Sequence, residues 1–199
     1  MMATSTKRVD GRTLRFQHRR PELLAAATEY VLEHGVTDLS LRPVAQALGI
    51  THATLLRHFA SKDDLVIAVL DKIRADVTEM LSADEELRAA RSTGELLRAF
   101  WHRSCEPRQQ RRFLVWFEVA GSGARNRALA QSVVDDWLDI IIERLIGDGW
   151  PPGDASALAT LVLAQVRGLH LDLLVSGDRA RVDRALEFSL RLLEPPEHP

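Results

Sequence analysis

The stretch that decides the fold is residues 40–59, SLRPVAQALGITHATLLRHF. Ser40 is a suitable cap for a first helix, and Pro43 lies in its first turn, where a missing N–H costs no intrahelical hydrogen bond. Gly49 supplies a turn conformation that residues with a β-carbon resist, and Thr51 can cap a second, short helix. The pattern predicts two helices joined by a tight turn, the layout of a helix-turn-helix.

The two predicted helices have distinct inner and outer faces. The inner positions are Val44, Ala45, Leu48, Ile50, Leu55 and Phe59. Ala45 is small, which lets the two helices cross closely. With Leu55 and Phe59 inside, the opposite side of the second helix can face a DNA major groove, and it presents His52, Ala53, Leu56 and Arg57.

The rest of the chain also predicts helices, because apolar residues recur three and four positions apart and no long β-type alternation interrupts them. We expect an all-α protein in which Pro21 starts a helix that runs through His34, and Ser61 caps a helix that starts at Lys62. After a polar joint at residues 82–91, further helices are expected at 93–105, 111–120, 128–146, 155–176 and 179–193. The predicted organisation is a basic arm at 1–20, a helix-turn-helix domain at 21–62 and a helical body at 63–199.

Composition limits the class of protein. The only cysteine among 199 residues is Cys105, which excludes an internal disulfide and any multi-cysteine zinc site. The first 20 residues are polar and basic, so we expect no secretory signal and a cytoplasmic location. Residues 158–175 are apolar but contain Gln165, Arg167, His170 and Asp172, so we expect no membrane span there.

Charge is distributed unevenly along the chain. Residues 1–62 contain nine Lys or Arg and five Asp or Glu, whereas the remainder contains 17 and 23. A basic head on an acidic body suits a protein whose head meets phosphates, although chance asymmetry would give the same pattern. The basic residues before residue 21 can lie along phosphates or enter a minor groove, or they can form a solubilising tail.

Residues 23–65 resemble the DNA-binding domain of the TetR family of regulators. The pieces that match are LLAAA at 23–27, EHG at 33–35, SLRPVA at 40–45, LGIT at 48–51, TLLRHFASK at 54–62, and Leu65. In order and at these spacings they form a specific signature. Leu56 departs from it, because the family usually has tyrosine there. Either a phosphate contact is lost at this position, or Leu56 makes an apolar contact such as one to a thymine methyl group.

The resemblance implies roles for individual residues on double-stranded DNA. It implies contacts to the DNA backbone from Arg42, Thr51, His58 and Lys62. It implies contacts to base edges from His52, Ala53, Thr54 and Arg57. His58 fits a packed position equally well. By the same resemblance, the protein is expected to be a repressor that a small molecule releases from its operator.

The body is expected to form a homodimer. Residues 155–176 are apolar around most of the helix, so one side can pack on its own domain and another on a second subunit. The resemblance likewise implies dimerisation through the last two long helices, which suits the two half-sites of a palindromic operator. The expected interface positions are Leu161, Gly168, Leu169, Val182 and Leu186. The alternative is a monomer with a thick core.

Aromatic residues are concentrated in the first three helices of the body, which predicts a site for an apolar or aromatic effector. The candidates are Trp101, Cys105, Trp116, Phe117, Gln165 and His170. For each of them ordinary core packing is the competing interpretation.

Two other classes of protein fit parts of the sequence. His102 and Cys105 lie three apart on one predicted helix and could form a base and nucleophile or bind a metal. The sequence offers them no recognisable oxyanion arrangement, phosphate loop or carboxylate spacing, so we expect no enzyme, metal or cofactor. A helical adaptor that binds only protein would leave the basic helix-turn-helix unexplained.

Overall fold

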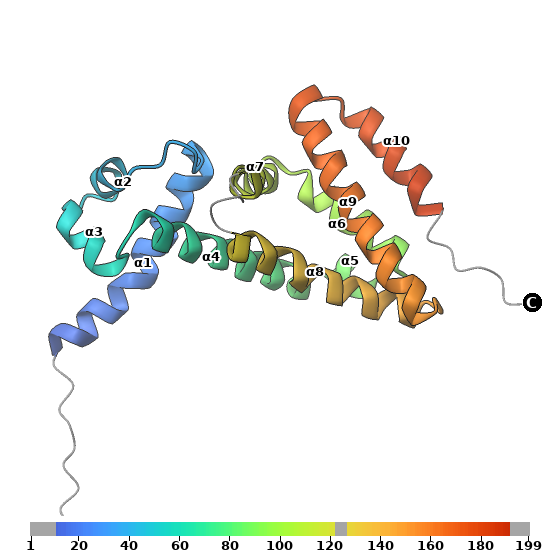
Figure 1. Ribbon diagram of the computed structural model, residues 1–199, viewed down its shortest axis with the longest axis horizontal. Helices are drawn as coiled ribbons and strands as arrows, with labels where there is room; N and C mark the ends of the chain where they lie inside the picture. The colour runs from blue at the N-terminus through green and yellow to red at the C-terminus, as the bar shows by residue number, and fades with distance from the viewer. Residues whose placement is uncertain (1–10, 122–126, 192–199) are drawn as a thin grey trace, which may run out of the picture. The chain divides into compact units, whose positions relative to one another are not determined.

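The chain is helical throughout the part that the computed structural model describes, residues 11–121 and 127–191. Figure 1 shows the helices in chain order, and no strand occurs among the described residues. The helices are α1 (Gly11–His34), α2 (Leu41–Ala47), α3 (His52–His58), α4 (Lys62–Ala83), α5 (Glu85–Ala89), α6 (Thr93–Ser104), α7 (Pro107–Gly121), α8 (Arg127–Gly147), α9 (Pro152–Ser176) and α10 (Arg179–Leu190). The predicted all-α class is confirmed.

The helices differ from the prediction most clearly at α1, α5 and α7. Helix α1 begins at Gly11, so Pro21 lies inside it and not at its start. Helix α7 begins at Pro107, whose missing N–H needs no partner in a first turn. Helix α5 occupies part of the expected polar joint, because the Asp84 carboxylate accepts the N–H groups of Glu86 and Leu87 and thereby caps it. The predicted break at 121–123 and the predicted end at 193 fall partly outside the described residues.

The chain divides into two compact units, residues 1–72 and 73–199. In the first unit, α2 and α3 pack on each other and α1 packs on α2. The core of this unit includes the fully buried side chains of Val31, Val44, Leu55, Phe59 and Leu65. The inner face predicted for the helix-turn-helix therefore supplies much of that core.

The second unit is organised around α9, which packs against α7, α8 and α10. Its core joins Leu97 and Trp101 of α6, Leu145 of α8, Val166 of α9 and Leu186 of α10. By length and composition α9 could cross a membrane, contrary to our expectation from its polar residues. One face of α9 is buried in this core, however, and His170 on that face is hydrogen-bonded, as a core helix requires.

Candidate functional site

The turn between α2 and α3 has the geometry that Gly49 was expected to supply. Gly49 has φ +66°, in the left-handed region that a β-carbon disfavours. The Ile50 N–H donates to the Ala45 carbonyl at 3.0 Å, and the Gly49 N–H donates to the Gln46 carbonyl at 3.1 Å. These two bonds form a Schellman motif, which ends α2 and directs the chain into α3.

Helix α3 is capped as predicted, and α2 is not. Thr51 Oγ1 accepts the backbone N–H of Thr54 at 3.1 Å. Ser40 occupies the N-cap position of α2, but its side chain makes no capping hydrogen bond. The start of α3 is therefore fixed by a side chain, and that of α2 by backbone conformation and Pro43.

The outer face of α3 presents a connected set of polar side chains. Ala53, Leu56 and Arg57 are exposed, and Thr54 is half-buried. Arg57 Nη2 donates to Thr54 Oγ1 at 3.2 Å, and Thr54 Oγ1 lies 2.9 Å from Thr51 Oγ1. The three side chains therefore form one hydrogen-bonded row that holds the Arg57 guanidinium along the helix.

The other residues expected to meet DNA lie around this row in the first unit. Arg42 on α2 is exposed, and His52 at the start of α3 is half-buried. Lys62 is half-buried, and its Nζ donates to the Thr37 carbonyl at 3.4 Å. Lys62 lies in the first turn of α4.

His58 differs from the other candidates, because only 7% of it is exposed. Burial, and then the neighbouring charges of Arg57, Arg19 and Arg20, lower the pKa of its imidazole. His58 therefore occupies a packed position, the alternative that the sequence had left open.

Arg20 was expected in a flexible arm, and it instead contacts the end of α3. Its Nε donates to the His58 carbonyl at 3.3 Å, and its guanidinium lies 5.1 Å from the ring centre of Phe59. No local signal in the sequence pointed to this contact, because the partners are 38 residues apart. Of the other basic arm residues, Lys7 and Arg8 and the side chains of Arg12 and Arg15 lie outside the described residues.

Four of the six effector candidates lie in one chain of aromatic rings between α6, α7 and α9. The His170 ring meets Trp101 edge-on at 4.6 Å and stacks on Phe113 at 3.7 Å. Phe113 lies 6.5 Å from Phe117, which meets Trp116 edge-on at 5.1 Å. Phe113 was not among the six expected lining residues, although its spacing of three and four from Trp116 and Phe117 marks a shared helix face.

An arginine lies at one end of this aromatic chain. The guanidinium carbon of Arg167 is 4.7 Å from the ring centre of Trp116, a cation–π distance. Burial lowers the pKa of Arg167. In the sequence, Arg167 is evident only as an interruption of an apolar segment.

The effector candidates also differ in burial. Trp101 and Cys105 are buried in the core of the second unit, which favours the packing interpretation for both. Gln165 is half-buried on α9, and no hydrogen bond to its side chain is found among the described residues. His170 is fully buried, with Nδ1 2.9 Å from the Val166 carbonyl and Nε2 2.9 Å from Ser104 Oγ. Burial lowers its pKa to about 4, so the ring is neutral near pH 7.

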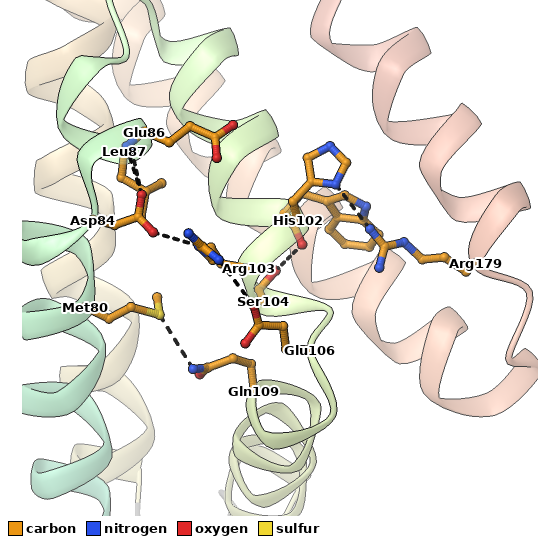
Figure 2. Close-up of polar contacts among 11 residues, drawn as sticks. Met80, Asp84, Glu86, Leu87, His102, Arg103, Ser104, Glu106, Gln109 and Arg179 are labelled. Atoms are coloured by element: carbon orange, nitrogen blue, oxygen red, sulfur yellow. Dashed lines mark hydrogen bonds and ion pairs between the residues drawn. The ribbon is translucent and has the colours of Figure 1, made fainter.

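Charged side chains join the start of α5 to α6 near this region (Figure 2). Arg103 Nε donates to Asp84 at 2.7 Å, and its Nη1 lies 3.5 Å from Glu106. The Leu87 backbone N–H and then Arg103 lower the pKa of Asp84. Because these groups satisfy helix caps and one another, they have structural roles.

The residues expected at the dimer interface separate into two groups. Val182 and Leu186 are 1% and 2% exposed, so they are core residues of the chain itself, and half-buried Leu169 also packs against the core. Leu161 and Gly168 lie on the exposed side of α9. They belong to an exposed apolar stripe with the spacing of one helix face: Ala157, Leu161, Ala164, Gly168, Leu171 and Val175.

The pair His102 and Cys105 does not have the geometry of a catalytic dyad. Cys105 is buried, and burial raises the pKa of its thiol to about 11, so the thiolate is scarce at neutral pH. His102 is exposed, and its Nδ1 lies 3.5 Å from Arg179 Nη2 (Figure 2). Among the described residues, no three His, Cys, Asp or Glu side chains are grouped to hold a metal.

Comparison with known sequences places the N-terminal segment in a family. Residues 23–69 match the sequence model of the bacterial regulatory proteins, tetR family. Over 62 residues, 31% of this chain, the protein is 37% identical to an HTH-type transcriptional repressor of Mycobacterium tuberculosis. That alignment spans about a third of the length of the curated relative, 33%.

Two solved structures share the fold over most of the chain. A TetR-family transcriptional regulator from Cytophaga hutchinsonii has a TM-score of 0.75 at 18% identity, covering 90% of this chain and 94% of the other. A transcriptional regulator from Saccharomonospora viridis, in complex with choline, has a TM-score of 0.74 at 21% identity, covering 88% and 96%. Residues 23–69 therefore match the tetR family of bacterial regulatory proteins, and most of the chain shares the fold of solved TetR-family structures.

Proposed function

We propose that the protein is a cytoplasmic transcriptional regulator that binds a palindromic DNA operator as a homodimer and releases it when a small molecule binds the body. The observation on which this rests is the exposed face of α3, where Thr51, Thr54 and Arg57 form a hydrogen-bonded row above a fully buried inner face. A rigid short helix with exposed donors is what a major groove accepts.

The proposed DNA contacts follow from exposure. Arg57 and Thr54 are directed to base edges, together with His52 and Ala53. Arg42, Thr51 and Lys62 are proposed to hold the backbone, where phosphate contacts fix the register of the protein. His58 is left out, because its side chain is buried. Leu56 is exposed and has no donor, so we assign it an apolar contact in the groove.

The proposed dimer forms through the exposed apolar sides of α9 and α10. Val175 on α9 is 81% exposed and Phe188 on α10 is 65% exposed, and both are large apolar side chains. Gly168 has nothing within 4 Å of the position of a β-carbon, so a partner helix can approach there. A two-fold axis would bury the exposed apolar side chains of α9 and α10 from both subunits. It would also give the dimer two DNA-binding units, one for each half-site of the operator.

The proposed release mechanism is a shift in population. A ligand bound among the aromatic side chains of α6, α7 and α9 would favour a dimer whose heads are spaced wrongly for successive major grooves. The S. viridis fold relative was solved with choline, which supports small-molecule binding in this fold. Repression as the direction of control is proposed from the M. tuberculosis relative.

The test is selection of bound duplexes from a random pool by the purified protein, followed by titration of the selected duplex at two salt concentrations. The expected result is an enriched palindrome bound by a dimer, with affinity that falls steeply as salt rises. Binding that depends on salt but selects no sequence would contradict the proposed base contacts. No binding to any duplex would contradict the proposal as a whole.

The alternative of an enzyme or metal protein that uses His102 and Cys105 is not favoured by any observation. Its nucleophile is buried with a raised pKa, and the imidazole of His102 faces Arg179.

A further inference from the structure

Arg167 is a charged group in an unusual setting. It is half-buried on α9, the most apolar helix of the second unit, and burial lowers its pKa. Two other arginines of the second unit, by contrast, form ion pairs: Arg98 with Glu187 at 2.7 Å, and Arg179 with Asp183 at 2.6 Å. Within residues 19–121 and 137–191, whose side chains the structure describes, no carboxylate or carbonyl accepts a hydrogen bond from Arg167.

The one described contact of Arg167 is with an aromatic face. The guanidinium carbon lies 4.7 Å from the ring centre of Trp116. A cation–π contact offsets part of the cost of removing the charge from water, but an indole face offers no carboxylate or carbonyl oxygen to the five N–H donors. The donors therefore lie beside aromatic rings.

The guanidinium group of Arg167 lies at one end of a row of aromatic side chains. Trp116 meets Phe117 at 5.1 Å, and Phe117 is followed by Phe113 and by the neutral ring of His170. His170 lies one helical turn from Arg167 on α9, so both side chains reach the same side of α7. A molecule placed here would meet aromatic faces at one end and, at the other, a guanidinium group with no carboxylate partner among the side chains that the structure describes.

We propose that the effector is an organic acid, with an aromatic or other apolar body that packs on Phe113, Trp116 and Phe117 and a carboxylate that Arg167 binds through paired N–H donors. Arginine suits this role because its planar fork matches a carboxylate at two points. This inference rests on the proposed function, since it names the chemical class of the small molecule that acts there.

The experiment is calorimetric titration of the full-length protein without DNA. The probes are two acids, 2-naphthoate and 3-phenylpropanoate, each compared with its neutral primary amide. We expect each acid that binds to do so at least tenfold more tightly than its amide. In Arg167→Gln this preference should disappear, while in Arg167→Lys, which keeps the charge but not the fork, it should be reduced.

The matched control is Arg88→Gln, which removes an exposed arginine from α5 and should keep the preference for acids. Equal binding of acid and amide by the unaltered protein would overturn the proposal, as would binding of neither pair or an unchanged preference in Arg167→Gln. The first two outcomes are measured on the unaltered protein, so the proposal can be tested even if the Arg167 variants do not fold.

The failure of this proposal can be told from failure of the proposed function. If the protein binds acids selectively but selects no duplex, the acid site is supported and the proposed function as a DNA-binding regulator is contradicted. If the protein selects a palindrome but shows no preference for acids, the regulator is supported and the acid site is contradicted.

Discussion

The indole Nε1 of Trp101 donates a hydrogen bond of 2.6 Å to Oδ1 of Asp183, which joins α6 to α10. Trp101 is 1% exposed, so this N–H has no access to water. Arg179 Nε donates to the same oxygen at 2.6 Å. Burial acts to raise the pKa of Asp183, but the hydrogen bonds from Trp101 and Arg179 outweigh it and the pKa lies below its usual value.

Replacing Asp183 tests this link. Asp183→Ala removes the acceptor of a buried donor and should lower the free energy of unfolding by about 1–3 kcal/mol. Asp183→Asn keeps an acceptor for the indole N–H and should lower the free energy of unfolding by less. Urea unfolding followed by tryptophan fluorescence measures both. Equal stability of the alanine variant and the unaltered protein would show that the bond is not stabilising.

The buried imidazole of His170 makes stability depend on pH. Its pKa is about 4 in the folded chain and about 6.5 when unfolded, so between these values the unfolded chain binds the extra proton. The contribution is fully present above pH 6.5 and is lost as the pH falls toward 4, by roughly 3 kcal/mol in all. We expect His170→Gln to flatten unfolding free energy over this range, and His102→Gln, at an exposed site, to leave the slope unchanged.

Two glycines should respond to alanine in opposite directions. Gly49 has φ +66° and open space around it, so Gly49→Ala should cost about 1–2 kcal/mol through backbone strain alone. Gly94 is helical, and a β-carbon there meets only Ser92 Oγ at 3.9 Å, so Gly94→Ala should stabilise by about 0.5–1 kcal/mol. Thermal unfolding of both variants shows whether each substitution raises or lowers stability. A stabilising Gly49→Ala would contradict the turn geometry.

The outer face of α3 should control discrimination between sequences. In the double variant His52→Ala with Arg57→Ala, we expect the ratio of affinities for the selected duplex and random duplex to fall about ten- to a hundredfold. Arg42→Ala, at a proposed phosphate contact, should weaken both affinities alike and reduce the salt slope by about 1. An unchanged ratio in the double variant would mean that bases are read elsewhere.

The exposed stripe on α9 should determine the oligomeric state. Leu161→Glu places a charge in the proposed two-fold interface, and the protein should become monomeric by light scattering at micromolar concentration. Leu114→Glu makes the same chemical change at an exposed site on α7 and should leave the dimer intact. A dimer that persists in Leu161→Glu would place the interface on another surface.

The sequence by itself determined the local features of this protein. The Gly49 turn, the Thr51 cap and the inner positions Val44, Leu55 and Phe59 could be predicted because each depends on residues a few positions apart. The helical class follows from the same short-range periodicity.

The tertiary structure decided which side of each apolar helix is covered. Helix α9 is apolar almost all round, and periodicity cannot say which stripe its own chain buries. Val182 and Leu186 were therefore expected at an interface and lie in the core, while exposed Val175 was not named among the interface positions. The contacts of Arg20 with the end of α3 and of Arg167 with Trp116 join residues 38 and 51 positions apart, and only packing brings such partners together.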